Sequence, residues 1–295
     1  MINRKNIREL AVVPPAVVAY LSDVADVCSG SFDSVVSLVA FGSAITGSYE
    51  TNTSDVDLLV VLADTAGEIE RERVRNGVAA LEDRHGLVKH RPSGHGRVAL
   101  ALKRFADRTS DNDRSFFVCS RADLLSGEPR RILNLPWPQA VLADGVVVPS
   151  MLASAITIWG EDILDDVSCH AIGRVDVAKS CFALSTASLF AAAAYVVFPD
   201  VTKYAMDTLK RSIHNCFYCH NGRLAHLRLE VSYFESQYGS RAAFAELLSL
   251  RQQYRPSFRF VVRCVSTVLE LHLRTALDLR FPRKVRPRRW ASGAS

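Results

Sequence analysis

The sequence lacks several features that mark membrane and exported proteins. No run of 18 or more apolar residues is present, although apolar residues make up 48% of the 295 positions. The first ten residues carry charges and have no apolar core before Pro14 and Pro15, so no signal peptide is expected. Seven cysteines occur without the spacing of a disulfide framework, which favours reduced thiols and a cytoplasmic protein.

Two common site patterns are also missing or misleading. The sequence has no Gly-x-Ser-x-Gly turn, so a hydrolase with a serine nucleophile is not expected. Cys216, Cys219 and His220 match a haem-attachment pattern, and His214 nearby could add a zinc ligand. Haem attachment requires export, however, and two cysteines on one apolar helix face are typical of a protein core. We therefore predict neither haem nor zinc here.

Basic residues are concentrated at the C-terminal end. The formal net charge is +5, but residues 280–295 contain six Arg and Lys residues and no acid. The rest of the chain is slightly negative. The Pro, Arg, Gly and Ser content of residues 280–295 predicts a disordered tail. Such a tail either keeps the chain soluble or binds RNA or another polyanion through phosphate contacts.

The most informative segment lies between two apolar runs, at residues 35–41 and 58–61. It contains a Gly-Ser pair (Gly42, Ser43), then Gly47, then two carboxylates one residue apart (Asp55, Asp57). The order predicts a strand, a tight turn with a short helical segment, and a second strand that begins with Asp-Val-Asp. The alternative is an ordinary turn followed by a strand.

Each part of this segment suits a nucleoside triphosphate with a divalent metal. Residues two apart in a strand point to the same side, so Asp55 and Asp57 can supply oxygen ligands to Mg²⁺. Gly42 lets the backbone approach a phosphate, and Ser43 adds a hydroxyl at the start of a helical segment. Gly47 is expected to end that segment with a positive φ.

This pattern resembles the DNA-polymerase-β-type nucleotidyltransferase superfamily, whose signature is Gly-Ser, a spacer, Gly, a longer spacer and Asp-x-Asp. The resemblance implies that Asp55 and Asp57 bind the metal ions and that Gly42 and Ser43 contact the triphosphate. Residues 153–164, which contain Trp159-Gly160, are similar to a segment that closes the catalytic domain of antibiotic nucleotidyltransferases. A plain strand followed by a glycine turn is the alternative for that segment.

The family normally adds a third carboxylate on a later strand. The next strand candidates, residues 86–90 and 97–105, contain no Asp or Glu. Asp107, just past the second candidate, is our first choice as the catalytic third acid, whereas Asp111 and Asp113 fit a solvated loop better. Without a third carboxylate, the chain could bind nucleotide without turnover.

The remaining patterns predict an α+β fold in which a small mixed β-sheet flanked by helices precedes an all-α helical bundle. We expect a catalytic domain over residues 1–170, a bundle over 171–279 and a basic tail over 280–295. Apolar periodicity predicts early helices near 14–27 and 66–84, further strands at 56–62 and 115–119, and an irregular segment at 126–150. The bundle helices are expected at 175–198, 202–219, 242–253 and 257–279, the first of them buried on most sides.

The resemblance further implies transfer of NMP, AMP from ATP as the first choice, to a hydroxyl of an acceptor, with release of pyrophosphate. A small molecule such as an aminoglycoside is the first acceptor considered. A toxin–antitoxin-type enzyme that modifies a protein or a tRNA is the alternative. Similar enzymes bring a Lys or Arg from the helical domain to the triphosphate, and Lys179 and Lys210 are our choices here. A solvated helix face explains these lysines equally well.

Overall fold

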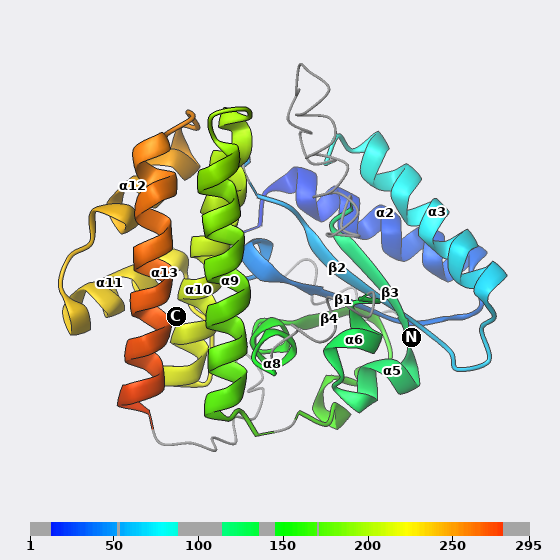
Figure 1. Cartoon of the computed structure of the whole chain (residues 1–295). Helices are drawn as coiled ribbons and strands as arrows, with labels where there is room; N and C mark the ends of the chain where they lie inside the picture. The colour runs from blue at the N-terminus through cyan, green and yellow to red at the C-terminus, as the bar shows by residue number, and fades with distance from the viewer. Residues whose placement is uncertain (1–12, 52–53, 88–113, 136–144, 170, 280–295) are drawn as a thin grey trace, which may run out of the picture.

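The computed structural model describes residues 13–51, 54–87, 114–135, 145–169 and 171–279 (Figure 1). A small mixed sheet with flanking helices is followed by a helical C-terminal region, which confirms the predicted α+β class. The strands predicted at 86–90 and 97–105, the acid Asp107 and the tail 280–295 lie outside the described residues. The boundaries 1–170 and 171–279 stay predictions.

The described sheet has four strands in the order β3-β2-β1-β4: β1 Val35–Phe41, β2 Asp57–Leu62, β3 Phe116–Ser120 and β4 Ile156–Gly160. The central strand β1 pairs antiparallel with both β2 and β4, while β2 pairs parallel with β3. The strands predicted at 35–41, 56–62 and 115–119 are therefore present, shifted by one residue at most. The segment that ends with Trp159-Gly160 forms the edge strand β4 of the described sheet.

Helices cover both faces of the sheet. One face carries α2 (Pro15–Ser31) and α3 (Glu68–Arg84), which pack against alternate strand residues such as Leu38, Leu58 and Val60. The other face carries three short helices: α5 (Arg121–Ser126), α6 (Pro129–Ile132) and α8 (Val147–Leu152). The described parts of segment 126–150 are thus less irregular than expected, because α6 and α8 bury Ile132, Val148 and Leu152 against the sheet.

The C-terminal region contains five long helices: α9 Arg174–Ala194, α10 Thr202–Asn221, α11 Leu227–Tyr238, α12 Ala242–Gln252 and α13 Phe258–Asp278. Four of them were predicted from periodicity, and α11 was not. A separate core fills the space between these helices. A smaller cluster, with Val146 and Ala153 on one side and Tyr218 and Cys219 on the other, joins α8 to α9 and α10.

The expectation that residues 175–198 form a helix buried on most sides is wrong. By length and composition α9 is the one described helix that could cross a membrane, but only 28% of its most apolar window is buried. Phe182 and Leu189 are each 61% exposed. One face of α9 packs on α10 and α13 through small residues such as Ser180, Ser188 and Ala191, and its other face is open. Figure 1 shows α9 at the outside of the helical region, beside α13.

Cys216 and Cys219 both lie in buried apolar clusters, as predicted, and neither forms a disulfide. His220 lies between Tyr233, Tyr238 and Thr275, whose hydroxyl groups are within 3.1–3.4 Å of its ring nitrogens. The Cys-x-x-Cys-His pattern therefore belongs to the packing of the helical region.

Candidate active site

The antiparallel pairing of β1 and β2 brings the two halves of the signature together. Phe41, the last residue of β1, lies opposite Asp57, the first residue of β2. The chain leaves β1 directly into a 3₁₀ turn, Gly42–Ala44, so the Gly-Ser turn and the carboxylates meet at one edge of the sheet. Gly47 follows with φ = 74°, the positive value predicted for it.

Gly42 touches the carboxylate of Asp57. Its φ is +76°, and a Cβ atom built on it would lie 2.1 Å from Asp57 Oδ2. Position 42 therefore requires glycine for two reasons: the backbone is left-handed, and a side chain would have no space beside the carboxylate. The Gly42 N–H donates a hydrogen bond to Ser154 Oγ at 3.4 Å. Ser154 lies just before β4, and no sequence pattern distinguishes it from other serines.

The two carboxylates lie on one side of β2. Val56 and Leu58 belong to the core under α2 and α3, which leaves Asp55 and Asp57 on the opposite side of the chain. Tyr49 is close to Asp55: burial raises the pKa of the Tyr49 phenol, and the negative charge of Asp55 raises it further. The common side of Asp55 and Asp57 agrees with the spacing argument, and their role as metal ligands stays a prediction.

The donor set suits a hard cation that completes its shell with phosphate oxygens and water. Asp55 and Asp57 would hold such an ion. No group of three or more His, Cys, Asp or Glu side chains is placed to hold a metal among the residues that the structure describes. Glu82 is a buried acid near the start of β3, but it lies on α3, across the sheet from Asp57, and accepts from Ser115 N–H at 3.0 Å. Glu82 therefore cannot replace the predicted third acid.

Arg251 is a site residue that the sequence did not reveal. It comes from the last turn of α12 and is only 6% exposed, yet it reaches the loop between Gly47 and Asp55. Its guanidinium donates to the Ser48 carbonyl at 2.6 Å and to Ser54 Oγ at 3.1 Å. Burial lowers its pKa, while nearby carboxylates, among them Asp207 and Asp55, favour the charged form.

A second contact ties the same loop to the helical region. The N–H of Leu227, the first residue of α11, donates to Ser48 Oγ at 2.9 Å. Ser48 is thus held by α11 through its hydroxyl and by α12 through its carbonyl. Nothing in the local sequence separates Ser48 from other loop serines, because both partners lie about 180 to 200 residues further along the chain.

The predicted lysines lie in different surroundings. Lys210 on α10 is 20% exposed and pairs with Asp207 at 3.7 Å, the same acid that acts on Arg251. Lys179 is exposed on α9. Lys203, the neighbour of Lys210 by helix spacing, lies 4.7 Å from the centre of the Tyr254 ring. Lys210 and Arg251 thus form one charge group, defined as the two cations that interact with Asp207. Lys179 does not belong to this group.

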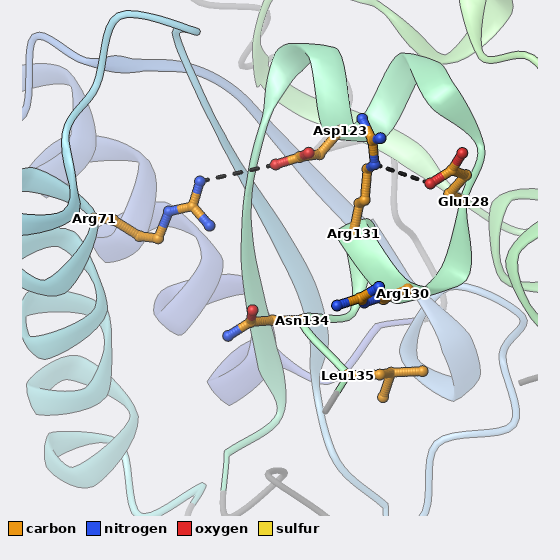
Figure 2. A pocket seen from close by; sticks show the side chains of 7 residues that line it. All are labelled: Arg71, Asp123, Glu128, Arg130, Arg131, Asn134 and Leu135. Carbon is orange, nitrogen blue, oxygen red and sulfur yellow. Dashed lines mark ion pairs between the residues drawn. The ribbon is translucent and has the colours of Figure 1, made fainter. Parts of the chain in front are cut away.

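A separate polar cavity of about 500 Å³ lies under α5 and α6 (Figure 2). It is at the other end of the sheet, because α5 follows the last residue of β3, and β3 runs parallel to β2. Two of its three arginines face carboxylates: Arg71 lies 3.8 Å from Asp123, and Arg131 lies 2.9 Å from Glu128. The cavity is not part of the candidate active site.

A match to a family model supports the assignment of the signature. Residues 21–90, which include β1, the turn, both carboxylates and α3, match the family model described as the nucleotidyltransferase domain. No curated protein sequence matches the chain. A spectinomycin adenyltransferase from Enterococcus faecialis, solved with ATP and spectinomycin, aligns at 11% identity and a TM-score of 0.47 over 88% of this chain and 98% of its own. Together with the Gly-Ser and Asp-Val-Asp signature, this family match identifies a nucleotidyltransferase domain that includes residues 21–90.

Proposed function

We propose that the protein is a Mg²⁺-dependent adenylyltransferase that moves AMP from ATP to a hydroxyl of a small-molecule acceptor and releases pyrophosphate. Nucleotide transfer in general follows from the domain, whereas the nucleotide, the metal and the acceptor are the proposal. The observation that carries it is the contact of Gly42 with the Asp57 carboxylate, because it joins the phosphate turn to the metal ligands.

In this proposal Asp55 and Asp57 hold Mg²⁺, which would neutralise charge on the triphosphate and stabilise the oxygens of an in-line displacement when bound. Gly42 lets the backbone approach the phosphates, and Ser43 supplies a hydroxyl beside them. Ser43 is the second residue of the 3₁₀ turn and is only 6% exposed, so its side chain is held in place by its neighbours.

Arg251 has a positioning role in this account. Its side chain reaches from α12 to the loop that connects Gly47 to Asp55, and its two hydrogen bonds fix the path of that loop. Because residues 35–64 contain no Lys or Arg, positive charge near the triphosphate must come from elsewhere in the chain. Lys210, which belongs to the same charge group as Arg251, is the residue we assign to the nucleotide. Asp107 stays the predicted general base.

The test is adenylyl transfer with the purified full chain, ATP, Mg²⁺ and a panel of aminoglycoside and aminocyclitol acceptors. We expect pyrophosphate release together with an acceptor whose mass has increased by one AMP. Asp57→Asn should abolish both signals. Asp33→Asn is the matched control, because Asp33 is an exposed acid at the opposite end of β1. If a co-purified protein or RNA is labelled and no compound of the panel is modified, the acceptor is a macromolecule and not a small molecule.

A further inference from the structure

The exposed apolar side chains of the C-terminal region gather on two helices. On α9 and the turn after it, and on α13, large apolar residues are between 42% and 85% exposed. We call this set the α9/α13 face: Phe182, Leu189, Phe190, Val196, Val197, Phe258, Val262, Leu269, Leu273 and Leu277.

The two helices form one continuous surface. They run antiparallel, since the ring of Tyr195 at the end of α9 lies beside that of Phe258 at the start of α13, with ring centres 5.2 Å apart. Towards the other end His272 Nε2 lies 3.2 Å from Ser180 Oγ. Because α10 packs against both helices from within, their free sides point outwards together, and Figure 1 shows them side by side.

The α9/α13 face is too large and too apolar to be an ordinary exposed surface. No charged residue occurs between Ser180 and Phe198. At roughly 200 Å² for a fully exposed Phe or Leu side chain, the exposed fractions add up to on the order of 1,000 Å². Monomeric proteins rarely expose a contiguous apolar patch above a few hundred Å², and a stable dimer buries about 800 Å² on each partner.

The spacing on α13 shows which partner fits. Its free stripe consists of positions 258, 262, 266, 269, 273 and 277, so successive spacings are 4, 4, 3, 4 and 4. This order reads the same in both directions about a midpoint between residues 267 and 268. A second α13 that runs antiparallel therefore presents the same stripe in register, with Phe258 opposite Leu277 and Val262 opposite Leu273.

The charges at the ends of α13 agree with this arrangement. Arg255, three residues before α13, and Arg259 in its first turn are exposed, and Asp278 is exposed at its last residue. An antiparallel pair places Asp278 of one helix near Arg255 and Arg259 of the other, which is favourable. Within each chain the stripe is bordered by ion pairs, such as Arg274 with Glu270 and Arg263 with Glu246, that remain on the rim.

We propose that the α9/α13 face is the interface of a homodimer, in which two copies of α13 pack antiparallel about a two-fold axis near residues 267 and 268. The symmetric spacing of the stripe favours a second copy of the chain over a lipid surface, because a lipid surface does not require any particular spacing of apolar residues. It also favours a second copy over residues 280–295 of the same chain, whose six basic residues do not complement an apolar surface. This inference does not depend on the proposed reaction.

The first experiment is the solution mass of the full chain by sedimentation equilibrium at micromolar concentration. We expect a dimer for the wild type and a monomer for Leu269→Glu/Leu273→Glu, with an unchanged circular dichroism spectrum because both side chains are exposed. Ile69→Glu is the control: Ile69 is 87% exposed on α3, across the molecule from α13. A monomeric wild type would overturn the proposal, as would a wild type that binds neutral phospholipid vesicles as a monomer.

A second experiment tests the antiparallel register. In the proposed dimer the two copies of residue 266 are offset by three positions along the helix axis, about 4.5 Å, whereas those of residue 262 are offset by eleven, about 16 Å. Only the first offset allows a disulfide. Ser266→Cys should therefore form a reducible dimer under mild oxidation, and Val262→Cys should not. Equal cross-linking of both variants, or cross-linking of Val262→Cys alone, would overturn the arrangement.

Discussion

Two features of the structure require a glycine at position 42. Its φ of +76° costs an L-residue about 1–2 kcal/mol. A Cβ atom would also meet Asp57 Oδ2 at 2.1 Å and displace the carboxylate. We therefore predict that Gly42→Ala lowers the free energy of unfolding by more than the backbone cost and abolishes ATP binding, measured by urea titration and calorimetry.

Two other glycines separate these two effects. Gly86 has φ = +63°, but no atom lies within 4 Å of the position that a Cβ atom would take, so Gly86→Ala should show the backbone cost alone. Gly30 lies in α2 with open space around it, and Gly30→Ala should be neutral or slightly stabilising. Equal losses for Gly42→Ala and Gly86→Ala would show that contact with Asp57 has no energetic consequence.

Arg251 supports the signature loop from the helical region. Arg251→Met removes two hydrogen bonds from a buried charged donor, each worth about 1.5–3 kcal/mol. It should lower the free energy of unfolding by about 2–4 kcal/mol and raise the KM for ATP more than it lowers kcat. The control is Arg255→Met, because Arg255 is exposed three residues beyond α12. A normal KM for ATP in Arg251→Met would exclude a positioning role.

At the scale of single elements, burial of a histidine links α9, α10 and α13. His272 on α13 is 2% exposed; its Nε2 lies 3.2 Å from Ser180 Oγ and its Nδ1 lies 3.2 Å from Ser212 Oγ. Burial lowers its pKa from 6.5 to about 4. The neutral ring is therefore favoured in the folded state, and stability is complete above pH 6.5 and decreases as the pH falls towards 4.

The loss between pH 7.5 and pH 5 should be about 2 kcal/mol, because one pKa unit corresponds to about 1.4 kcal/mol. Urea unfolding of the wild type and of His272→Gln at both pH values tests this. The variant should lose about 2 kcal/mol less than the wild type over this range. An identical pH dependence in both proteins would place the titrating groups elsewhere.

Elements near the signature could be predicted well from sequence, and the reason is local. The apolar run 35–41, the glycines and the Asp-Val-Asp pattern each specify backbone geometry within a few residues, so β1, the turn and β2 were expected where they lie. The apolar run 175–198 predicted a helix but not its exposure. An apolar helix at an interface between chains has the same composition as one in a core, and the periodicity of α9 does not separate the two.

The contacts that complete the site could not be predicted, because they join distant segments. Arg251 and Leu227 meet Ser48 only after the helical region has packed beside the sheet. Ser154 reaches Gly42 only because β4 pairs with β1. No local pattern marks these residues. The choice of Asp107 as the third acid stays a prediction.

At the scale of the whole molecule, the helical region is expected to supply positive charge to a site whose own segment, residues 35–64, contains no Lys or Arg. Lys210→Ala should raise the KM for ATP severalfold, since Lys210 shares Asp207 with Arg251. Lys179→Ala should have a smaller effect, because Lys179 is exposed on α9. Deletion of residues 282–295 should change neither value if the acceptor is a small molecule. Steady-state kinetics of the three variants tests these expectations. Loss of activity in the truncated chain alone would instead indicate an RNA acceptor.

The most direct test of the central claim is calorimetric titration of the chain with ATP, with and without Mg²⁺. We claim that Gly42, Ser43, Asp55 and Asp57 form one site for a metal-bound triphosphate. Wild-type protein and Asp33→Asn should bind ATP more tightly with Mg²⁺ than without it. Asp55→Asn and Asp57→Asn should lose this gain while they keep the wild-type unfolding transition. If both variants bind Mg²⁺–ATP as tightly as the wild type, the nucleotide site lies elsewhere and the account is wrong.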